Sequence, residues 1–520
     1  MADMNRRIFL AGGAGLALVG IFGPRIFKTG GGSLSFPSDQ LLPEKVRNMP
    51  TRAAAELAPT FWQDRARDCY SILFDFNATG ENLPVIWNDT ARRHYDFDIF
   101  ALPAYLGDYR QNSQIMESHE SLSALGAVIG ASLSGIDMQN LNGRDFVKEC
   151  LGFHQGQGLA KVLFNQTLES GSESSFWYMI YPNLAFFAIN SLYPEKEGFD
   201  DVSRSIAEEF FGMLDNVKTI DGAFSFDFTG YNFLRKEGIY GAHREPDAAA
   251  GTAWILYMSY MRFGDEKYLA GAKKCLDYLS QRPREESPFY EVLLGYGATL
   301  VARMNKEVGT SYDVDKYLSW IFDGFSVPRA GWGIISDTWG SYEVQGLQGS
   351  TTDSGGYAFA FNTFNIAAAL APLPLYDSRF TCAIGKWLHN ISVSSRLFYP
   401  DQVKPEEQSQ PEFIGKYKNA LAYEGIRKEW AFTTPYATAD SRRMTWANTD
   451  IGIYGSGLVG VFAGLILPSD DPELSIFDIT KTDFFGKSPT TYLVYNSTNK
   501  EKEYRGIKIP AGNAVLIPLK

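Results

Sequence analysis

The residues best suited to chemistry are carboxylates set among aromatic residues and glycines, and the densest group lies between residues 332 and 357. Its carboxylates are Asp337, Glu343 and Asp353, and its aromatic residues include Trp339, Tyr342 and Tyr357. Cleavage of a glycosidic bond needs two carboxyl groups, one to protonate the leaving oxygen and one to activate water or attack. We therefore predict catalytic roles for the three carboxylates and substrate binding for the three aromatic residues. Asp353 also fits a simpler role as a helix N-cap.

A second group precedes a small-residue-rich helix. It consists of His243, Arg244, Glu245 and Asp247, with Pro246 between the two acids. Pro246 and Asp247 also suit the first turn of a helix, which is the structural alternative. That alternative does not account for Glu245 and His243. We predict that Glu245 and Asp247 are catalytic and that His243 and Arg244 bind substrate.

Further candidate substrate-binding residues stand in other connections and at helix starts. They are His94, Asp96, Trp177, Tyr178, Asn183, Glu291, Tyr436 and Asp440. Core packing is the alternative for most of the aromatic residues. The loop around Asp440 also carries Glu424, Trp446, Asn448 and Asp450, a composition that suits a sugar subsite. Asp96 and Asp98 lack the glycine and glutamate spacing of a calcium loop, and we predict neither a metal nor a cofactor.

The elements that must position these residues are mostly helices. Apolar periodicity, caps and breakers predict about twelve, at roughly 53–76, 118–136, 143–167, 173–192, 199–215, 246–262, 265–280, 289–307, 313–324, 355–370, 377–393 and 450–465. The even-numbered segments are apolar nearly all round and so belong inside, whereas several odd-numbered ones are amphipathic. The long connections 77–117, 216–245, 325–354 and 394–449 all follow odd-numbered helices. In an up-and-down array they lie on one face, and loops of such length are usually functional.

This pattern, over about residues 50–465, resembles the (α/α)6 toroid of the six-hairpin glycosidase superfamily. The resemblance implies a mainly α fold with a carbohydrate-processing site on the elaborated face. We find no 34- or 40-residue repeat of the kind that would indicate a helical solenoid. From about residue 468 the composition favours short strands at 491–496, 506–510 and 514–517. We therefore predict a toroid over 36–467 and a small β appendage over 468–520 that packs against it.

Charge and the N-terminus restrict partners and location. Over 520 residues, 48 Lys and Arg face 60 Asp and Glu, a net charge of −12, which argues against nucleic acid or anionic membrane surfaces as partners. Arg6 and Arg7 precede a short apolar stretch and resemble a twin-arginine export signal. We predict that residues 1–35 are an export signal or membrane anchor and that the protein is periplasmic or extracellular. A disordered tail is the alternative, and no oligomeric state follows from the sequence.

Three functions fit these residues. The preferred one is an exported glycoside hydrolase with a carboxylate pair, for which the resemblance favours inversion. The second is a polysaccharide lyase that would draw on Tyr357, His243, Arg244 and Asn183. The third is a non-catalytic glycan-binding protein. The sequence contains no P-loop, nucleophile-elbow or HExxH motif, and its long loops are acidic or mixed, which favours hydrolysis over cleavage of a polyanion.

Overall fold

The computed structural model describes residues 39–53, 56–112, 120–156, 160–166, 171–173, 175–329 and 331–519. The predicted export signal, residues 1–35, lies outside these ranges. Within them, no helix has both the length and the apolar character that crossing a membrane requires.

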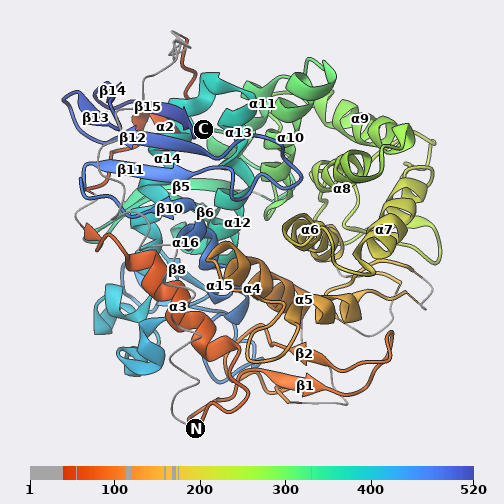
Figure 1. The fold of residues 1–520 in the computed structure, drawn as a ribbon, viewed down its shortest axis with the longest axis horizontal. Helices are drawn as coiled ribbons and strands as arrows, with labels where there is room; N and C mark the ends of the chain where they lie inside the picture. Colours follow the sequence, from red (N-terminus) through yellow and green to blue (C-terminus); the bar gives the residue numbers. More distant parts are fainter. Residues whose placement is uncertain are drawn as a thin grey trace.

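A closed inner ring of helices forms the centre of the described part of the chain (Figure 1). Its members in chain order are α4 (Ser121–Leu133), α6 (Phe176–Leu192), α8 (Ala248–Phe263), α10 (Leu293–Val308), α12 (Ala360–Leu370) and the pair α15 (Ile453–Ser456) and α16 (Gly460–Leu465). Each member packs on the next, and α15 and α16 pack on α4 to close the ring. At this closure, a side chain on Gly460 would lie 1.9 Å from the carbonyl oxygen of Gly130. The close approach of the last and first inner helices therefore requires glycine.

An outer layer of helices covers the inner ring. It contains α3 (Phe61–Leu73), α5 (Phe146–Glu149) with the 3₁₀ helix η2 (Cys150–Phe153), α7 (Phe199–Met213), α9 (Glu266–Ser280), α11 (Val314–Phe322) and α14 (Thr381–Ser394). Within the described residues, inner and outer helices alternate along the chain as six hairpins, so the predicted (α/α)6 toroid is confirmed. The predicted inner and outer assignments are also confirmed.

Three predicted helices differ from the structure. Among the described residues of the segment 143–167, the only helices are α5 and η2, because the chain then turns at Gly156 and an isolated bridge joins His154 to Leu163. The segment 450–465 is divided into α15 and α16, since closely spaced glycines lower helix propensity. The helix predicted from residue 53 begins only at Phe61, after Pro59.

The connection 325–354, predicted as a loop, folds into a sheet. The hairpin β5 (Trp332–Trp339) and β6 (Tyr342–Ser350) joins β7 (Tyr357–Phe359), β8 (Gly425–Arg427) and β9 (Tyr436–Thr438) in an antiparallel order β5-β6-β7-β8-β9. Gly340 adopts φ 58° in the turn between β5 and β6, a conformation that glycine adopts without steric cost. The sheet unites two long connections and places β7 and β8 at the N-terminal end of α12.

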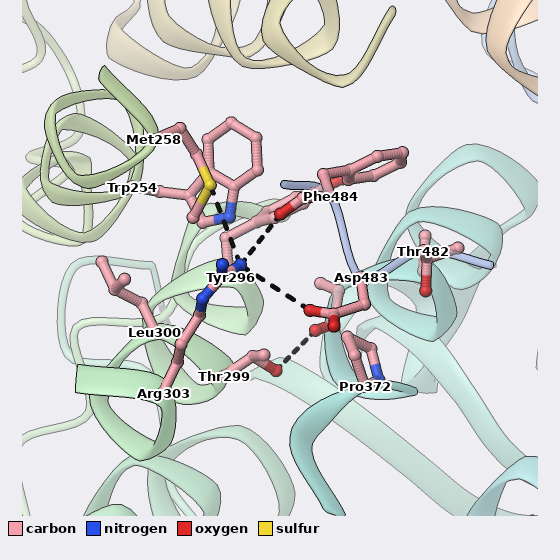
Figure 2. A pocket seen from close by; sticks show the side chains of 12 residues that line it. Trp254, Met258, Tyr296, Thr299, Leu300, Arg303, Pro372, Thr482, Asp483 and Phe484 are labelled. Carbon is pink, nitrogen blue, oxygen red and sulfur yellow. Dashed lines mark hydrogen bonds and ion pairs between the residues drawn. The ribbon is translucent and has the colours of Figure 1, made fainter. Parts of the chain in front are cut away.

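The C-terminal segment is β-rich, as predicted. Strands β10 (Ile466–Leu467), β11 (Leu474–Asp478), β12 (Thr491–Asn496) and β15 (Ala514–Pro518) form one sheet, and β13 (Lys502–Tyr504) pairs with β14 (Ile507–Ile509). Strands β12 and β15 pack on α14. The connection from β11 to β12 reaches the C-terminal ends of the inner helices, where Phe484 and Asp483 approach Arg303 of α10 (Figure 2).

The remaining elements are short. They are α2 (Glu44–Asn48), α13 (Leu373–Tyr376), β1 (Trp87–Asp89), β2 (Ile99–Ala101), β3 (Gly230–Asn232) and β4 (Glu237–Ile239). The pairs β1–β2 and β3–β4 belong to long connections that lead into inner helices. The long connections therefore enter the inner ring at the N-terminal ends of its helices, and the elaborated face is this N-terminal end.

Candidate functional site

Acidic side chains gather where the long connections enter the inner helices. We call this set the carboxyl cluster; its members are Glu173, Glu245, Asp247, Glu291 and Glu424. Glu173 precedes α6, Glu245 and Asp247 precede α8, and Glu291 precedes α10. Glu424 is adjacent to α12, because its carbonyl oxygen accepts the N–H of Ala360, the first residue of that helix, at 2.9 Å. Successive inner helices thus present carboxyl groups at the same end of the ring.

Two members of the cluster form hydrogen bonds with backbone N–H groups at the N-terminal end of a neighbouring helix. Glu245 accepts the backbone N–H of Trp177 in α6 at 3.0 Å. Asp247 accepts the N–H of Tyr290, just before α10, at 3.0 Å. The N–H groups at a helix N-terminus have no intrahelical partner and favour a carboxylate. The carboxyl groups of Glu245 and Asp247 therefore help to hold the N-terminal ends of adjacent inner helices together. This is a structural role for two of the predicted catalytic residues.

Burial raises the pKa of Glu245 and of Asp247 well above the ordinary value, and nearby carboxyl groups add to the effect. The two side chains are about 1% exposed, so the charged form has little water to solvate it. Asp247 Oδ1 is buried and has no hydrogen-bond partner among the described residues. The protonated carboxyl is favoured at both positions.

Glu291 has a backbone conformation that is rare for its residue type. Its φ is 54°, in the left-handed region that favours glycine. Its carbonyl oxygen accepts the Trp332 indole N–H at 3.3 Å and an N–H of the Gln348 amide, so tertiary contacts hold this conformation. Such residues cluster at functional sites.

The Glu291 carboxyl accepts the Asn362 amide of α12 at 2.7 Å, and Arg329 lies 3.8 Å away. Burial nevertheless raises its pKa, while Asn362 and Arg329 act in the opposite direction. Glu424 also raises it through electrostatic repulsion, and Glu291 in turn raises the pKa of Glu245 and of Asp247. Glu291 therefore interacts with three other members of the cluster, and burial favours its protonated form.

Three tyrosine hydroxyls converge on Glu424. Tyr105 donates to Oε1 at 2.5 Å, Tyr454 donates to Oε1 at 2.8 Å, and Tyr357 donates to Oε2. The backbone N–H of Asp440 adds a fourth donor at 3.1 Å. Hydrogen bonds to a carboxylate stabilise its charged form. Burial and the Glu424 charge raise the pKa of each tyrosine well above the ordinary value, so these phenols stay protonated.

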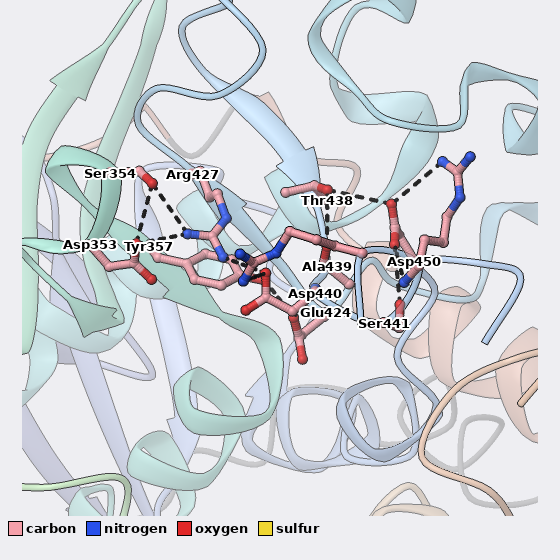
Figure 3. Close-up of polar contacts among 12 residues, drawn as sticks. Asp353, Ser354, Tyr357, Glu424, Arg427, Thr438, Ala439, Asp440, Ser441 and Asp450 are labelled. Atoms are coloured by element: carbon pink, nitrogen blue, oxygen red, sulfur yellow. Dashed lines mark hydrogen bonds and ion pairs between the residues drawn. The ribbon is translucent and has the colours of Figure 1, made fainter. Parts of the chain in front are cut away.

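Arg427 of β8 links three predicted residues that are distant in sequence. It forms ion pairs with Asp353 at 3.0 Å and with Asp440 at 2.9 Å, and its guanidinium lies 3.6 Å from the centre of the Tyr357 ring (Figure 3). The structure thus unites Asp353, Asp440 and Tyr357, but around a cation. Asp353 begins the 3₁₀ helix η3 (Asp353–Gly355), and its side chain pairs with Arg427 rather than capping α12.

The other predicted residues of the hairpin lie on β5 and β6. Asp337 pairs with Lys428 at 2.7 Å. Burial is the largest single influence on the Asp337 pKa and raises it, but the hydrogen bonds from Lys428, Thr338 and Trp339 together lower it below the ordinary value. Glu343 accepts Thr338 Oγ1 at 2.9 Å, and Trp339 is buried with its indole N–H on Asp337. Tyr342 donates to Glu407. Within the described part of the chain, no hydrogen bond or ion pair joins Asp337 or Glu343 to the carboxyl cluster.

The predicted residues of α6 have different surroundings. Trp177 and Tyr178 have ring centres 4.0 Å apart. Tyr178 is partly exposed. Burial raises its pKa most, and the charges of Glu291, Glu424 and Glu173 raise it further. Tyr178 therefore lies beside the cluster. Asn183 is fully buried, and its amide bonds the backbone of Leu163 and Met179. Its role is structural.

The remaining predicted residues lie outside the cluster. His243 and Arg244 are exposed, and the His243 ring lies 6.3 Å from that of Tyr290. His94 lines a small hollow with Arg92 and Arg93, whereas Asp96 is exposed. Tyr436 is a half-buried residue of β9.

Sequence reasoning did not assign roles to several residues that the structure places at this end. They are Tyr105, Glu120, Glu173, Arg329, Arg427 and Tyr454. Burial raises the pKa of Glu173 to about 7. The available signal was positional, because Glu120 is the N-cap of α4 and Glu173 also stands just before an inner helix. Among the described residues, no group of three or more His, Cys, Asp or Glu side chains is placed to hold a metal ion.

No protein-family model and no curated protein matches this chain. Among solved structures it is similar to a D-mannose isomerase, with 9% identity, coverage of 78% of this chain and 97% of that chain, and a TM-score of 0.43. A family 76 glycoside hydrolase (mannosidase) from Bacteroides thetaiotaomicron matches with 11% identity, 77% and 97% coverage and a TM-score of 0.44. A cellobiose 2-epimerase from Bacillus thermoamylovorans matches with 9% identity, 78% and 99% coverage and a TM-score of 0.44. At such values the fold assignment depends on the helix contacts above, and any reaction must be argued from this chain's own residues.

Proposed function

We propose that this protein is a carbohydrate-active enzyme, a glycoside hydrolase whose acid and base are Glu291 and Glu424. The observation that carries the proposal is that these carboxyl groups interact electrostatically yet have opposite surroundings. Glu291 is buried with a raised pKa, whereas Glu424 receives hydroxyl hydrogens from three tyrosines. Titratable pairs in divergent environments are typical of acid and base assignments.

In this proposal Glu291 donates a proton to the glycosidic oxygen as the bond to the sugar breaks. Glu424, on which three tyrosine hydroxyls converge, accepts a proton from the attacking water. Burial opposes the ionisation of Glu291, and repulsion from Glu424 adds to this effect. The acid pKa must be high enough for the proton to be present near neutral pH.

Partly exposed aromatic side chains at this end supply faces for a sugar ring. Tyr178 lies beside the cluster, and Tyr454 both donates to Glu424 and packs edge-on against Tyr105. Phe359, at the entrance to α12, stacks on Trp332 with ring centres 5.6 Å apart. Aromatic rings combine apolar contact area with defined geometry, and these three supply that combination next to the two carboxyl groups.

The surroundings of the residues considered for a lyase favour hydrolysis. Tyr357 has a strongly raised pKa and is therefore a poor base. Arg244 is exposed. A further cation at this end, Arg427, is already paired with Asp353 and Asp440, so it is a poor partner for a uronate carboxylate. Asn183 is bonded to backbone groups, and His243 is exposed.

The test is product analysis on a panel of neutral and uronate-containing glycans. New reducing ends without the ultraviolet absorbance of an unsaturated sugar support a hydrolase, and their loss in Glu291→Gln and Glu424→Gln supports the named pair. Absorbance that rises with cleavage would establish a lyase and overturn the proposal. Binding without product from any glycan would indicate a glycan-binding protein. Proton NMR of the first-formed anomer tests inversion, which requires carboxyl groups about 6.5–9.5 Å apart.

Export remains part of the proposal and depends on Arg6 and Arg7. We expect the intact chain in the periplasmic or extracellular fraction of a bacterial host that has the twin-arginine pathway. Replacing both residues with lysine should retain the protein in the cytoplasm. Equal fractionation of the two forms would contradict a twin-arginine route.

A further inference from the structure

Trp446 is an exposed indole on a firmly held loop of the elaborated face. Trp446 is 47% exposed, and Tyr109 close by is 67% exposed. The backbone N–H of Trp446 donates to the Ser441 carbonyl at 2.9 Å, and the Trp446 carbonyl accepts the backbone N–H of Tyr109 at 3.0 Å. The backbone on both sides of the indole is therefore ordered before any ligand binds, which reduces the entropic cost of binding.

The 105–109 segment lies in close contact with the loop that carries Trp446. The backbone N–H of Asn448 donates to the Gly107 carbonyl at 3.1 Å, and Asp108 and Ala447 form an isolated antiparallel β-bridge. Gly107 has φ 72°, and a Cβ there would lie 2.0 Å from Asn448 Oδ1. Only glycine allows the 105–109 segment to support the Trp446 loop in this way.

The base of the Trp446 loop is fixed by buried polar contacts. Asp450, which is 2% exposed, accepts Ser441 Oγ at 3.1 Å and Thr438 Oγ1 at 3.4 Å (Figure 3). Ser441 Oγ also contacts the Thr449 carbonyl at 2.7 Å. The position of the exposed indole is thus set from beneath by groups that water does not reach.

A single tyrosine connects Trp446 to the carboxyl cluster. The Tyr105 and Trp446 rings are stacked, with centres 6.3 Å apart and an interplanar angle of 28°, and the hydroxyl of the same tyrosine donates to Glu424 at 2.5 Å. The loop also meets Glu424 directly, through the Asp440 N–H. The indole therefore lies one aromatic residue away from the proposed base.

The charges at this end indicate which kind of sugar fits. The carboxyl cluster is acidic, and the cations beside the Trp446 loop are already paired: Arg443 with Asp440 at 3.0 Å and Arg110 with Asp108 at 3.0 Å. A uronate chain would bring a further carboxylate to buried carboxyl groups whose ionisation burial and mutual repulsion already oppose. A neutral sugar would avoid that repulsion and would present apolar C–H faces to an indole.

We propose that Trp446, supported by Tyr105, is a sugar-binding platform next to the Glu424 carboxylate and that the substrate is a neutral oligosaccharide long enough to reach it. This inference rests on the proposed function and names its substrate class. Only the reacting sugar would lie between Glu291 and Glu424, and a further ring of the same chain would stack on Trp446.

The experiment uses the full chain and four neutral probes: mannotetraose, cellotetraose, xylotetraose and maltotetraose, each with its disaccharide. For the tetrasaccharide that is cleaved, we expect Trp446→Ala to raise KM about tenfold, as the loss of one aromatic contact of about 1.4 kcal/mol predicts, with kcat unchanged. Cleavage of the disaccharide should be unaffected. The matched control is Tyr504→Ala, which removes a partly exposed aromatic ring from β13 in the C-terminal segment.

A second readout does not depend on turnover. In Glu291→Gln, the bound tetrasaccharide should protect one tryptophan from acrylamide quenching, and Trp446→Leu in that background should abolish the protection while circular dichroism shows the fold intact. Cleavage of a tetrasaccharide with unchanged KM in Trp446→Ala would overturn the platform but leave the hydrolase standing. Cleavage of uronate glycans alone would overturn the neutral-substrate inference. Cleavage of nothing would overturn both proposals.

Discussion

The two ends of the inner ring both contain buried charges, but they organise them differently. At the C-terminal end, Arg303 pairs with Glu307 at 2.9 Å and lies 3.6 Å from Asp483. Its guanidinium also bonds the carbonyl of Phe484 at 2.9 Å (Figure 2) and that of Phe485 at 2.9 Å. At the N-terminal end, buried carboxyl groups interact with one another, and Arg329 lies 3.8 Å from Glu291.

Under the proposed function, the difference separates a structural network from a catalytic one. Around Arg303 each charge has an opposite charge or dipole, which is what a buried ion pair needs to be tolerated. In the carboxyl cluster, burial and like charge raise pKa values, a costly arrangement that is frequent at functional sites. The C-terminal end of the ring, which we call the closed end, holds the C-terminal segment through Arg303. The N-terminal, acidic end is the proposed site of chemistry.

The largest expected effect is on catalysis at the acidic end. We predict that Glu424→Gln and Glu291→Gln each lower kcat about 10²–10⁴-fold, because each removes a proton-transfer group. Steady-state rates on the substrate found in the glycan panel provide the measurement, with thermal unfolding as the check on folding. Near-normal rates in both variants would show that the acidic end of the ring is not the site of catalysis.

The closed end should respond in stability and not in chemistry. Arg303→Ala leaves Asp483 and Glu307 without their buried cation, so we predict a loss of about 3–5 kcal/mol in the free energy of unfolding. Urea denaturation measures this change. Below the unfolding transition kcat should match that of the wild type; a fall in kcat with stability unchanged would refute the structural role.

Glu173 provides a pH test of the acidic end. Burial raises its pKa from 4.5 to about 7 in the folded protein, so between these values the folded state holds a proton that the unfolded state has released. The contribution to stability is therefore greatest below the unfolded pKa and declines as pH rises through about 7. The melting temperature of Glu173→Gln should fall less steeply than that of the wild type between pH 5 and pH 8. Parallel profiles would contradict the raised pKa.

The smallest effect is expected on the hairpin. Asp337 is 41% exposed and pairs with Lys428 at the surface, so Asp337→Asn should change the free energy of unfolding by less than about 1 kcal/mol. Its kcat should equal that of the wild type. Loss of catalysis with a normal melting temperature would instead restore Asp337 as a catalytic candidate and displace the Glu291–Glu424 pair.

The helical part of the fold was predictable because its signals are local. Apolar residues repeat at helical spacing in α9, and Asp265 caps that helix by accepting the Lys267 N–H. The hairpin β5–β6 was missed because its strands contain several glycines and polar residues, a composition typical of loops. Its pairing depends on the turn at Gly340 and on burial against α14.

By itself, the sequence determined the alternation of inner and outer helices, the single elaborated face, and acidic residues at helix entrances such as Glu245 and Glu291. Only the tertiary structure decided which of these residues meet. Tyr105, Tyr357 and Tyr454 come from distant segments and converge on Glu424, whereas Asp353 is drawn to Arg427. The physical reason is that helix formation follows from contacts a few residues apart, while the charge and burial of a carboxyl group depend on neighbours that only the closure of the ring brings together.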